Sequence, residues 1–304
     1  MKEPTVASLV RLGEALRAAR YSFVTVTPES HRRVLARRQR AESLRDVFGW
    51  SLPFAYDDLP RDVAAAMRDG DLAAGGAAGQ VSQVRFSTLH DGLYAHSAYP
   101  TDTVDAVFFG PDTYRFCRAI RQSARRARVV VDVGCGSGAG GIVAGHEAER
   151  VILADVNERA LVFARANAML NGVDRAEVVL SDVLAGIDAA PDLIVANPPY
   201  LRDALGRTYR DGGGSFGEAL AVRIARESLA RLAPGGHLLL YTGAAVVDGV
   251  DTFFQAIAPA LEKANADVCY EEIDPDVFGE ELSGAAYAAV DRIAAVLLEA
   301  TLVG

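Results

Sequence analysis

Short runs of apolar residues recur along the second two-thirds of the chain, separated by polar or glycine-rich breaks. Runs rich in Val, Ile and Leu are typical of strands that are buried on both faces of a parallel sheet. The longer segments between them place apolar residues every three or four positions, which indicates helices. This alternation predicts an α/β fold. Strands are expected at residues 129–131, 151–154, 176–180, 192–196 and 237–241, with a final antiparallel pair at 268–273 and 293–303.

The first 100 residues follow a different pattern. Leu9, Leu12 and Leu16 share one face of a helix predicted over residues 6–19. The sequence Thr-Pro-Glu at 27–29 supplies an N-cap, a proline at the first helical position and an early acid, so a second helix is expected from there to about residue 40. The remaining expected elements are short helices at 44–48 and 59–67, a loop at 73–79, and a hairpin of strands 81–88 and 93–98.

Several short helices followed by a hairpin are similar to a winged-helix module. Such modules bind nucleic acid in some proteins and recognise other proteins in many, and the sequence does not decide between the two. Residues 100–105 have the composition of a linker. We therefore expect a small, mainly helical substrate-recognition domain over residues 1–100 and a larger α/β domain over residues 101–304.

A glycine-rich turn follows the first strand of the larger domain, with the sequence Asp-Val-Gly-Cys-Gly-Ser-Gly at residues 132–138. Glycine permits positive φ and lets a ligand approach the main chain closely. The segment also matches the G-x-G-x-x-G pattern of dinucleotide-binding proteins. An acid at its start would repel a pyrophosphate, however, and suits a cofactor that carries an ammonium and a sulfonium. The candidate cofactor-binding residues are Asp132, Gly134, Cys135, Gly136 and Gly138.

The next two strands also end in acids. Asp155 lies about twenty residues beyond the glycines, where ribose hydroxyls are usually held. Asp182 follows the third strand and is placed to accept a hydrogen bond from an adenine amino group, while the amide of Val183 could donate to the ring. Three consecutive strand ends thus offer groups that fit an adenosyl cofactor, and the candidate set is extended by Asp155, Val156, Asp182 and Val183.

The fourth strand runs directly into Asn-Pro-Pro-Tyr at residues 197–200. Two successive prolines fix φ and remove two donors, so the carbonyl groups here should be held rigidly and point into the pocket. The Asn197 side-chain oxygen and the Pro198 carbonyl could then accept both hydrogens of a planar NH2 group, with Tyr200 stacked on its flat face. Aiming that nitrogen at an electrophilic methyl group is catalysis by positioning. The candidate catalytic residues are therefore Asn197, Pro198, Pro199 and Tyr200, and Asn197 is also expected at the cofactor.

Together, these motifs resemble the class I S-adenosylmethionine (SAM) methyltransferases over residues 107–304. Within that superfamily, Asn-Pro-Pro-Tyr is shared by N6-adenine methyltransferases and by the HemK/PrmC type, which methylate the glutamine side chain of peptide-chain release factors. The sequences Gly-Pro-Asp-Thr at 110–113 and Asp-Gly-Gly-Gly-Ser-Phe-Gly at 211–217 are similar to the second group, although an arginine is usual where Gly110 stands. The resemblance implies a Rossmann-like seven-stranded sheet, SAM as cofactor and S-adenosylhomocysteine as product.

Three further segments receive expectations. The segment 108–114 either caps a helix that ends near residue 126 or folds over the methionine end of the cofactor, which makes Phe109 and Thr113 candidate cofactor-binding residues. Residues 201–210 are polar and are expected to cover the acceptor. Residues 274–284 are expected to form an acidic surface loop.

Charge is unevenly distributed in this 304-residue chain. Residues 1–50 hold ten Lys and Arg against five Asp and Glu, a net charge of +5, so the remainder carries −14 to reach the overall −9. Only the arginines between residues 32 and 40 could attract a phosphate backbone, and the alternative is a solvated helix face. Three scattered cysteines give no metal-binding spacing. With neither a membrane-spanning run nor a signal-peptide core, we expect a cytoplasmic protein without a membrane partner.

We therefore expect an SAM-dependent N-methyltransferase that acts on a planar amide or amine nitrogen. The preferred partner is a protein whose glutamine side chain is methylated at N5, such as a translation release factor. The first alternative is methylation of adenine N6 in RNA or DNA, with residues 32–40 as the nucleic-acid contact. The second alternative is a regulator that binds SAM without turnover.

Overall fold

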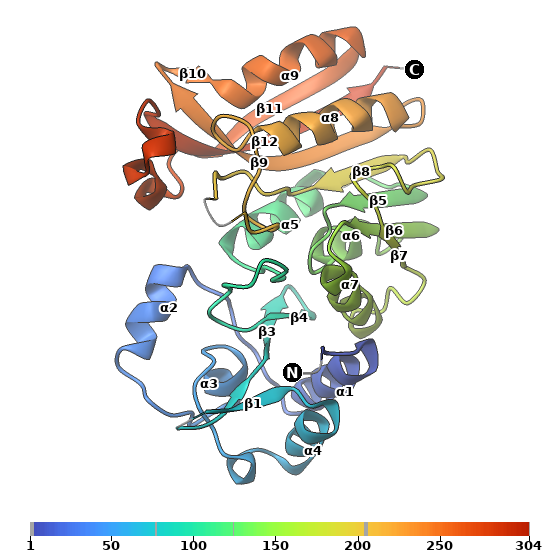
Figure 1. Ribbon diagram of the computed structural model, residues 1–304. Coiled ribbons are helices and arrows are strands. Elements are labelled where there is room, and N and C mark those ends of the chain that lie inside the picture. Colours follow the sequence, from blue (N-terminus) through green and yellow to red (C-terminus); the bar gives the residue numbers. More distant parts are fainter. Residues whose placement is uncertain (1–2, 77, 124, 204–205, 304) are drawn as a thin grey trace.

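A sheet of eight strands runs through the larger part of the molecule (Figure 1). The computed structural model describes residues 3–76, 78–123, 125–203 and 206–303. The strand order is β11-β12-β9-β8-β5-β6-β7, and the short β10 pairs with β9. Strands from β9 to β7 are parallel, whereas β12 is antiparallel to both β9 and β11. The bounds are β5 Val129–Val133, β6 Arg150–Asp155, β7 Glu177–Leu180, β8 Leu193–Ala196, β9 His237–Val247, β10 Val250–Asp251, β11 Ala266–Asp274 and β12 Arg292–Leu302.

Helices cover both faces of this sheet, as the apolar strands predicted. Val130 of β5 packs among side chains of α5, α6 and α7, whereas the next residue, Val131, packs among those of α8 and α9. Because successive residues of a strand point to opposite faces, each face buries its own core. The covering helices are α5 Pro111–Ser123, α6 Ala139–Ala144, α7 Glu158–Leu170, α8 Ala219–Arg231 and α9 Thr252–Lys263. The expected Rossmann-like α/β fold is therefore confirmed.

The N-terminal part combines helices with two hairpins, which pair β1 with β2 and β3 with β4. Its elements are α1 Val6–Ala18, α2 Pro28–Leu35, α3 Leu44–Phe48, a 3-10 turn Tyr56–Asp58, α4 Arg61–Gly70, β1 Ala73–Gly76, β2 Gly79–Ser82, β3 Val84–Leu89 and β4 Gly92–Ser97. The hairpin predicted near residue 90 is present. The similarity to a winged-helix module stays a prediction.

Two N-terminal expectations were wrong. The second helix ends at Leu35 and does not continue to residue 40, because Arg38 and Arg40 turn aside to reach Asp46 and Asp58 at 2.6 and 3.1 Å. Like charges four residues apart would also destabilise a longer helix. Residues 73–79, expected to be a loop, contribute to a hairpin, since their small side chains permit antiparallel pairing between β1 and β2.

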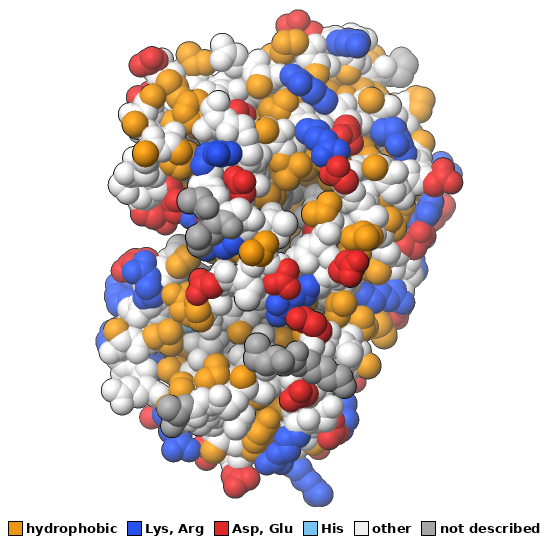
Figure 2. Space-filling view, in the orientation of Figure 1, with side chains coloured by type: hydrophobic (Ala, Val, Ile, Leu, Met, Phe, Trp, Pro, Cys, Tyr) orange, Lys and Arg blue, Asp and Glu red, His pale blue; other side chains and the backbone are white. Residues whose placement is uncertain are grey.

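Helix α7 lies between the sheet and the N-terminal part, and it packs on both. Ala164 belongs to the core beneath the sheet, whereas Phe163 and Leu170 belong to the N-terminal core around Leu12 and Phe86. The N-terminal core thus extends beyond residue 100, and the domain boundary there stays a proposal. A space-filling view shows a notch between the two parts, on the left (Figure 2). In the described part of the chain, no helix combines the length and the hydrophobicity that crossing a bilayer requires.

Candidate active site

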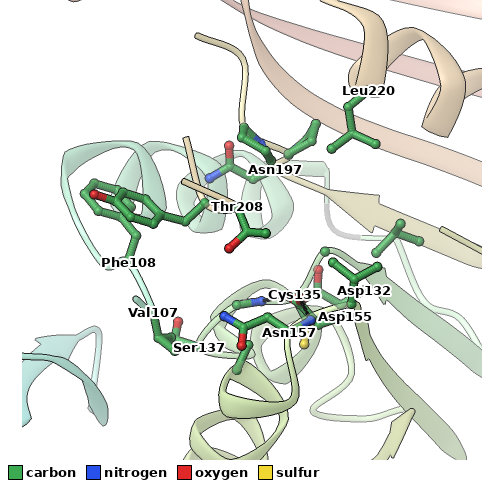
Figure 3. Close-up of a pocket in the computed structure, with 18 of the residues that line it drawn as sticks. Val107, Phe108, Asp132, Cys135, Ser137, Asp155, Asn157, Asn197, Thr208 and Leu220 are labelled. Atoms are coloured by element: carbon green, nitrogen blue, oxygen red, sulfur yellow. Dashed lines mark hydrogen bonds between the residues drawn. The ribbon is translucent and has the colours of Figure 1, made fainter. Parts of the chain in front are cut away.

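A cavity of about 390 Å3 opens at the carboxyl ends of the parallel strands. The strand order reverses between β5 and β8, where ligands of open α/β sheets bind. Asn197 lies across this cavity from Ser137, Asn157 and Asp155 (Figure 3). Most of the predicted site residues line the cavity, namely Thr113, Asp132, Gly134, Cys135, Gly136, Asp155, Val156, Asp182, Val183, Asn197, Pro198 and Pro199.

Three predicted residues do not line this cavity: Phe109, Gly138 and Tyr200, the last of which lines an adjoining cavity. Phe109 is buried against Tyr94 and His96, with ring centroids 5.7 and 5.2 Å away, and its neighbour Phe108 lines the cavity instead. Successive side chains of an extended segment point in opposite directions, so the prediction was wrong by one position. Gly138 begins α6 with φ of 77°, and a Cβ there would lie 3.2 Å from the Ala164 Cα, so its contribution is to helix packing.

Two acids hold the glycine-rich turn in place: Asp132 precedes the turn, and Asp155 lies opposite it at the end of β6. Gly134 and Gly136 adopt φ of 66° and 53°, a left-handed conformation that glycine enters without the Cβ penalty. The Gly136 amide donates to Asp155 at 2.8 Å, and the Gly141 amide donates to Asp132 at 2.7 Å. Each acid therefore fixes one side of the loop while its carboxyl group faces the cavity.

Both acids are buried without a cationic partner among the described residues. Burial raises the pKa of Asp132 to about 7; the Gly141 N–H opposes this rise, and the nearby Asp155 carboxylate adds a smaller increase. Burial also raises the pKa of Asp155, against the amide donors of Asn157 and Gly136. Ionising these groups would be favoured by a cation in the cavity. A cofactor with an ammonium and a sulfonium meets that requirement, so the residues present fit SAM.

The third acid is differently placed. Asp182 lines the cavity, but its carboxylate is largely exposed and accepts two hydrogen bonds from Arg223 of α8, at 2.8 and 2.9 Å. This Arg223 guanidinium lowers the pKa of Asp182. The predicted hydrogen bond from adenine to Asp182 therefore has to share the carboxylate with Arg223, a partner that the sequence did not reveal.

A second cavity of about 310 Å3 adjoins the first, and Asn197, Pro198 and Pro199 line both. No hydrogen bond engages the Asn197 side chain within the described residues, so its amide is free to meet a ligand from either side. Tyr200 lines the second cavity only. The strand end thus separates a cofactor space from an acceptor space.

Tyr200 is held by contacts that the sequence did not predict. Its hydroxyl donates to one Asp112 oxygen at 2.8 Å, and Tyr241 donates to the other at 2.9 Å. Burial, together with the Asp112 carboxylate, raises the pKa of Tyr200 well above its usual range, so this residue is a donor and not a base. Its ring also lies on the backbone of β9, where a Cβ on Gly243 would approach it to 2.2 Å.

The glycines of the 211–217 segment have a similar packing reason. A Cβ on Gly212 would lie 2.6 Å from the Pro199 carbonyl oxygen, and one on Gly217 would lie 2.2 Å from that of Tyr200. The Gly212 amide donates to the Leu201 carbonyl at 2.9 Å. This segment therefore supports the backbone of the Asn-Pro-Pro-Tyr motif from behind.

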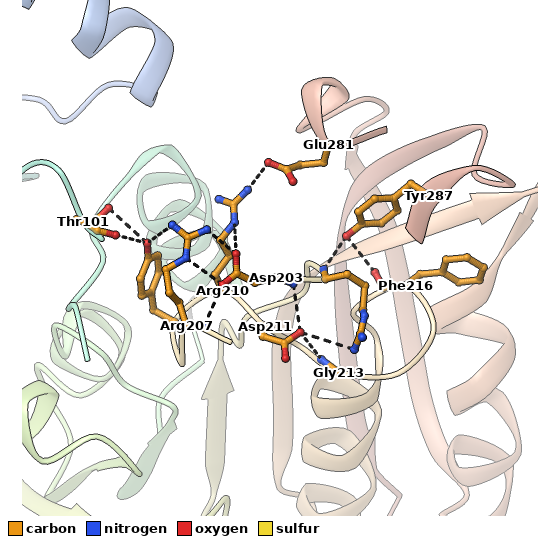
Figure 4. Close-up of polar contacts among 11 residues, drawn as sticks. Thr101, Asp203, Arg207, Arg210, Asp211, Gly213, Phe216, Glu281 and Tyr287 are labelled. Carbon is orange, nitrogen blue, oxygen red and sulfur yellow. Dashed lines mark hydrogen bonds and ion pairs between the residues drawn. The ribbon is translucent and has the colours of Figure 1, made fainter. Parts of the chain in front are cut away.

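Residues 201–210 were expected to cover the acceptor, and residues 204–205 lie outside the described part. The remainder is bound to two distant segments (Figure 4). Tyr209 donates to the Thr101 carbonyl at 2.6 Å, and Arg210 pairs with Glu281. The Arg202 amide donates to the Tyr287 hydroxyl at 2.7 Å. These contacts place the segment between the linker near residue 101 and the insertion before β12.

Sequence reasoning missed several lining residues. Leu220 and Ile224 of α8 line the cofactor cavity. Their four-residue spacing is typical of one helix face, and the sequence gives no further sign that this face borders the cavity. Asn157, Thr208 and Tyr209 also line that cavity, and they carried no such signal.

Comparisons with known proteins agree with this geometry. Residues 115–246 match the family model of the methyltransferase small domain. A release factor glutamine methyltransferase from Cereibacter sphaeroides is 33% identical over 255 residues, which cover 78% of this chain and 87% of that enzyme. The chain belongs to the release factor glutamine methyltransferase family.

Other members and relatives match shorter stretches of this methyltransferase. The release factor glutamine methyltransferase of Deinococcus radiodurans is 38% identical over 36% of this chain, and the match spans 44% of that enzyme. The ribosomal RNA small subunit methyltransferase C of Chromohalobacter salexigens is 35% identical over 38% of this chain and 31% of its own length. This methyltransferase thus spans less than half of the length of both relatives.

Solved structures show the same fold. Trm5b from Pyrococcus abyssi is similar with a TM-score of 0.53 at 16% identity, covering 82% of this chain and 69% of that one. SAM is the cofactor of this methyltransferase, and when bound it supplies a methyl group on a sulfonium sulfur. Gly110 stands where the resemblance implied an arginine; a Cβ there would lie 2.4 Å from the Phe108 ring, and Arg115 contacts Asp112 at 3.1 Å.

Proposed function

We propose that this methyltransferase transfers a methyl group from SAM to the side-chain nitrogen of a glutamine in a translation release factor. The observation that carries the proposal is the position of Asn197, whose unengaged amide stands where the cofactor cavity and the acceptor cavity meet. A planar NH2 group that enters from the acceptor side can donate one hydrogen to the Asn197 oxygen and the other to the Pro198 carbonyl. Its lone pair is then directed toward the cofactor cavity.

Positioning accounts for the chemistry. When bound between the glycine-rich turn and Asn197, SAM would supply an electrophilic methyl group and leave as a neutral thioether. Asn197 and Pro198 would hold the acceptor nitrogen toward that methyl group, and the methylated nitrogen would lose one proton to solvent. Tyr200 is kept protonated by burial and by Asp112, so its contribution is to form the cavity wall and not to remove that proton. Rigid prolines and the support of residues 211–217 keep the acceptor carbonyls preorganised.

The charge around the acceptor cavity supports a protein acceptor. Asp274, Asp276 and Glu280 line it, and the arginines that line it are already paired. Arg115 contacts Asp112 and Asp274, at 3.1 and 3.0 Å. Arg210 pairs with Asp203 and Glu281. A phosphate backbone would meet net negative charge here, whereas a neutral or basic peptide would not.

Three of the five arginines between residues 32 and 40 are already paired with acids, which weakens the support for a nucleic-acid acceptor. Arg32 pairs with Glu29 at 2.7 Å, and Arg38 and Arg40 pair with Asp46 and Asp58. Acidic and basic side chains are intermixed over the face shown in Figure 2. Methylation of adenine in RNA remains the second candidate, because an RNA methyltransferase is among the relatives and an adenine amino group suits the same two oxygens.

The test is a transfer assay with tritiated SAM and two purified acceptors, a bacterial release factor and small-subunit ribosomal RNA. We expect label in the release factor, located at a glutamine by mass spectrometry. Asn197→Ala should abolish transfer and leave the SAM dissociation constant within about threefold, since it removes one acceptor of a two-point contact. The control is Gln255→Ala, on the exposed face of α9.

Other outcomes separate the alternatives. Label that enters only RNA would establish the adenine alternative and refute the protein acceptor. Normal SAM binding without transfer to any acceptor or to a whole-cell extract would support a regulator. A release-factor acceptor also implies that the proposed activity takes place in the cytoplasm, where translation occurs.

A further inference from the structure

The segment that connects β11 to β12 is part of the acceptor cavity and not a free surface loop. Val277, Phe278 and Glu280 line the cavity together with Tyr200. The segment is fixed along its length: the Val277 amide donates to the Ile293 carbonyl at 2.8 Å, and the Tyr287 hydroxyl accepts from the Arg202 amide. An acidic loop that only served solubility would not need these ties.

Phe278 is the unusual residue of this segment. Its backbone is left-handed, with φ of 57° and ψ of 36°, a conformation that bulky side chains rarely adopt. Such strain persists only where surrounding contacts impose it, and it clusters at ligand sites. The strain here places the Phe278 ring edge-to-face against Tyr200, with centroids 5.9 Å apart and planes at 69°. The pair forms an aromatic corner on the acceptor side of Asn197.

One carboxylate fixes both halves of this corner. Asp112 accepts from the Tyr200 hydroxyl at 2.8 Å and contacts Arg115 at 3.1 Å. Arg115 also contacts Asp274 at 3.0 Å, at the end of β11, four residues before Phe278. A chain of contacts thus runs from Tyr200 through Asp112 and Arg115 to Asp274. It sets the distance between the catalytic motif and the segment that carries Phe278.

We propose that Phe278 determines acceptor affinity and specificity by holding the acceptor peptide segment in the aromatic corner that Phe278 forms with Tyr200. In this proposal, Arg115 positions Phe278. This inference rests on the proposed function and names the residues that bind its protein substrate. Phe278 contacts the acceptor and takes no part in the transfer step. Arg115 lines the same cavity, but its guanidinium is engaged by Asp112 and Asp274, so it is a positioning residue that acts through these two acids.

The main test uses full-length protein, SAM and purified release factor. Phe278→Ala and Phe278→Gly should each raise the acceptor KM about tenfold, the effect expected for an aromatic contact of about 1.4 kcal/mol. The value of kcat should stay within about twofold, and so should the SAM dissociation constant, because neither the reacting atoms nor the cofactor cavity changes. Phe254→Ala, a phenylalanine on α9 away from the site, is the control.

The Phe278→Gly variant distinguishes the loss of the acceptor contact from a loss of protein stability. Glycine relieves the left-handed strain, so Phe278→Gly should unfold no more readily than Phe278→Ala while binding the acceptor equally weakly. Binding is also measured without turnover, by fluorescence anisotropy of labelled release factor on protein saturated with S-adenosylhomocysteine. An unchanged dissociation constant in both variants would overturn the inference and leave the proposed function intact.

Arg115 is tested by a rescue series. Arg115→Met should raise the acceptor KM several-fold with kcat nearly unchanged, and Arg115→Lys should restore part of the loss because it keeps the charge between Asp112 and Asp274. In the double variant Arg115→Met with Phe278→Ala, the increase in the free-energy equivalent of the acceptor KM should be smaller than the sum of the two single-variant increases, because Arg115 acts through Phe278. Fully additive effects would remove Arg115 from this role. If wild-type protein methylates no release factor, the proposed function and this inference fall together.

Discussion

The buried Asp132 makes the stability of the methyltransferase depend on pH in a direction opposite to that of an ordinary carboxylate. Its side chain is 2% exposed, and burial raises its pKa from 3.8 to about 7. One pKa unit corresponds to about 1.4 kcal/mol, so this difference is equivalent to about 4 kcal/mol between the protonated and ionised states. Asp132→Asn removes the titration and keeps an oxygen that can accept from the Gly141 amide.

The sign follows from proton counting. Between pH 4 and pH 7 the folded cofactor-free protein keeps a proton on Asp132 that the unfolded chain has lost. Stability from this group is therefore fully present below the unfolded pKa and is lost as pH rises through about 7. A bound cation favours the ionised carboxylate, so SAM affinity should increase as pH rises over the same range, by up to about tenfold per pH unit.

The assay is urea unfolding of wild type and Asp132→Asn at half-unit steps from pH 4.5 to 8, with calorimetric titration of SAM at the same pH values. The difference in free energy of unfolding, wild type minus variant, should fall by several kcal/mol across the series. SAM affinity of the variant should be weaker than that of wild type near pH 8 and should depend less on pH, because Asp155 alone of the two buried acids still titrates. A stability difference that stays level between pH 4.5 and 7.5 would show that Asp132 is already ionised, and our account of the site would be wrong.

Three further changes test the supports of the site. Asn167→Leu leaves backbone polar groups of Ala95 and Ser137 without their partner, because the Asn167 side-chain amide bonds both at 2.7 to 2.9 Å. We expect the free energy of unfolding in urea to fall by about 3 kcal/mol and SAM binding to weaken in calorimetry. Unchanged values would contradict this expectation. Gly243→Ala should displace the Tyr200 ring and reduce kcat at least tenfold with SAM affinity retained, as steady-state kinetics would show. Tyr200→Phe removes one hydrogen bond to Asp112 and should raise the acceptor KM by about three- to tenfold. The resulting loss in kcat/KM should be smaller than that of Gly243→Ala. Equal losses in kcat/KM would mean that the hydroxyl alone positions the ring.

The sheet could be predicted because its strands are buried on both faces. Residues 151–154 and 193–196 are short apolar runs, and they lie in β6 Arg150–Asp155 and β8 Leu193–Ala196. The glycine-rich turn could also be predicted, because the positive φ of Gly134 and Gly136 leaves few other residue types possible there. These features depend on local backbone chemistry and on burial, both of which are encoded in consecutive residues.

Positions that depend on side-chain direction were harder to predict. Phe108 and Phe109 are adjacent and identical in type, and only the fold decides that the first lines the cavity while the second packs against His96. Asp182 follows the third strand and lines the cavity, yet its pair with Arg223 joins residues 41 positions apart. No periodicity in the sequence reports such a contact.

The acidic segment before β12 shows most clearly why local composition misleads. Asp274, Glu280 and Glu281 gave it the appearance of a solvated loop, and charge runs usually are solvated. Asp274 pairs with Arg115 of α5, however, and Glu281 pairs with Arg210 of the segment after Tyr200, and both arginines line the acceptor cavity. These two acids are thus compensated by cations that the cavity wall supplies, which allows the segment to stay against the cavity and to carry Phe278 there, while Glu280 is exposed. A charge pattern therefore predicts exposure only when the opposite charges lie in the same segment, and here they do not.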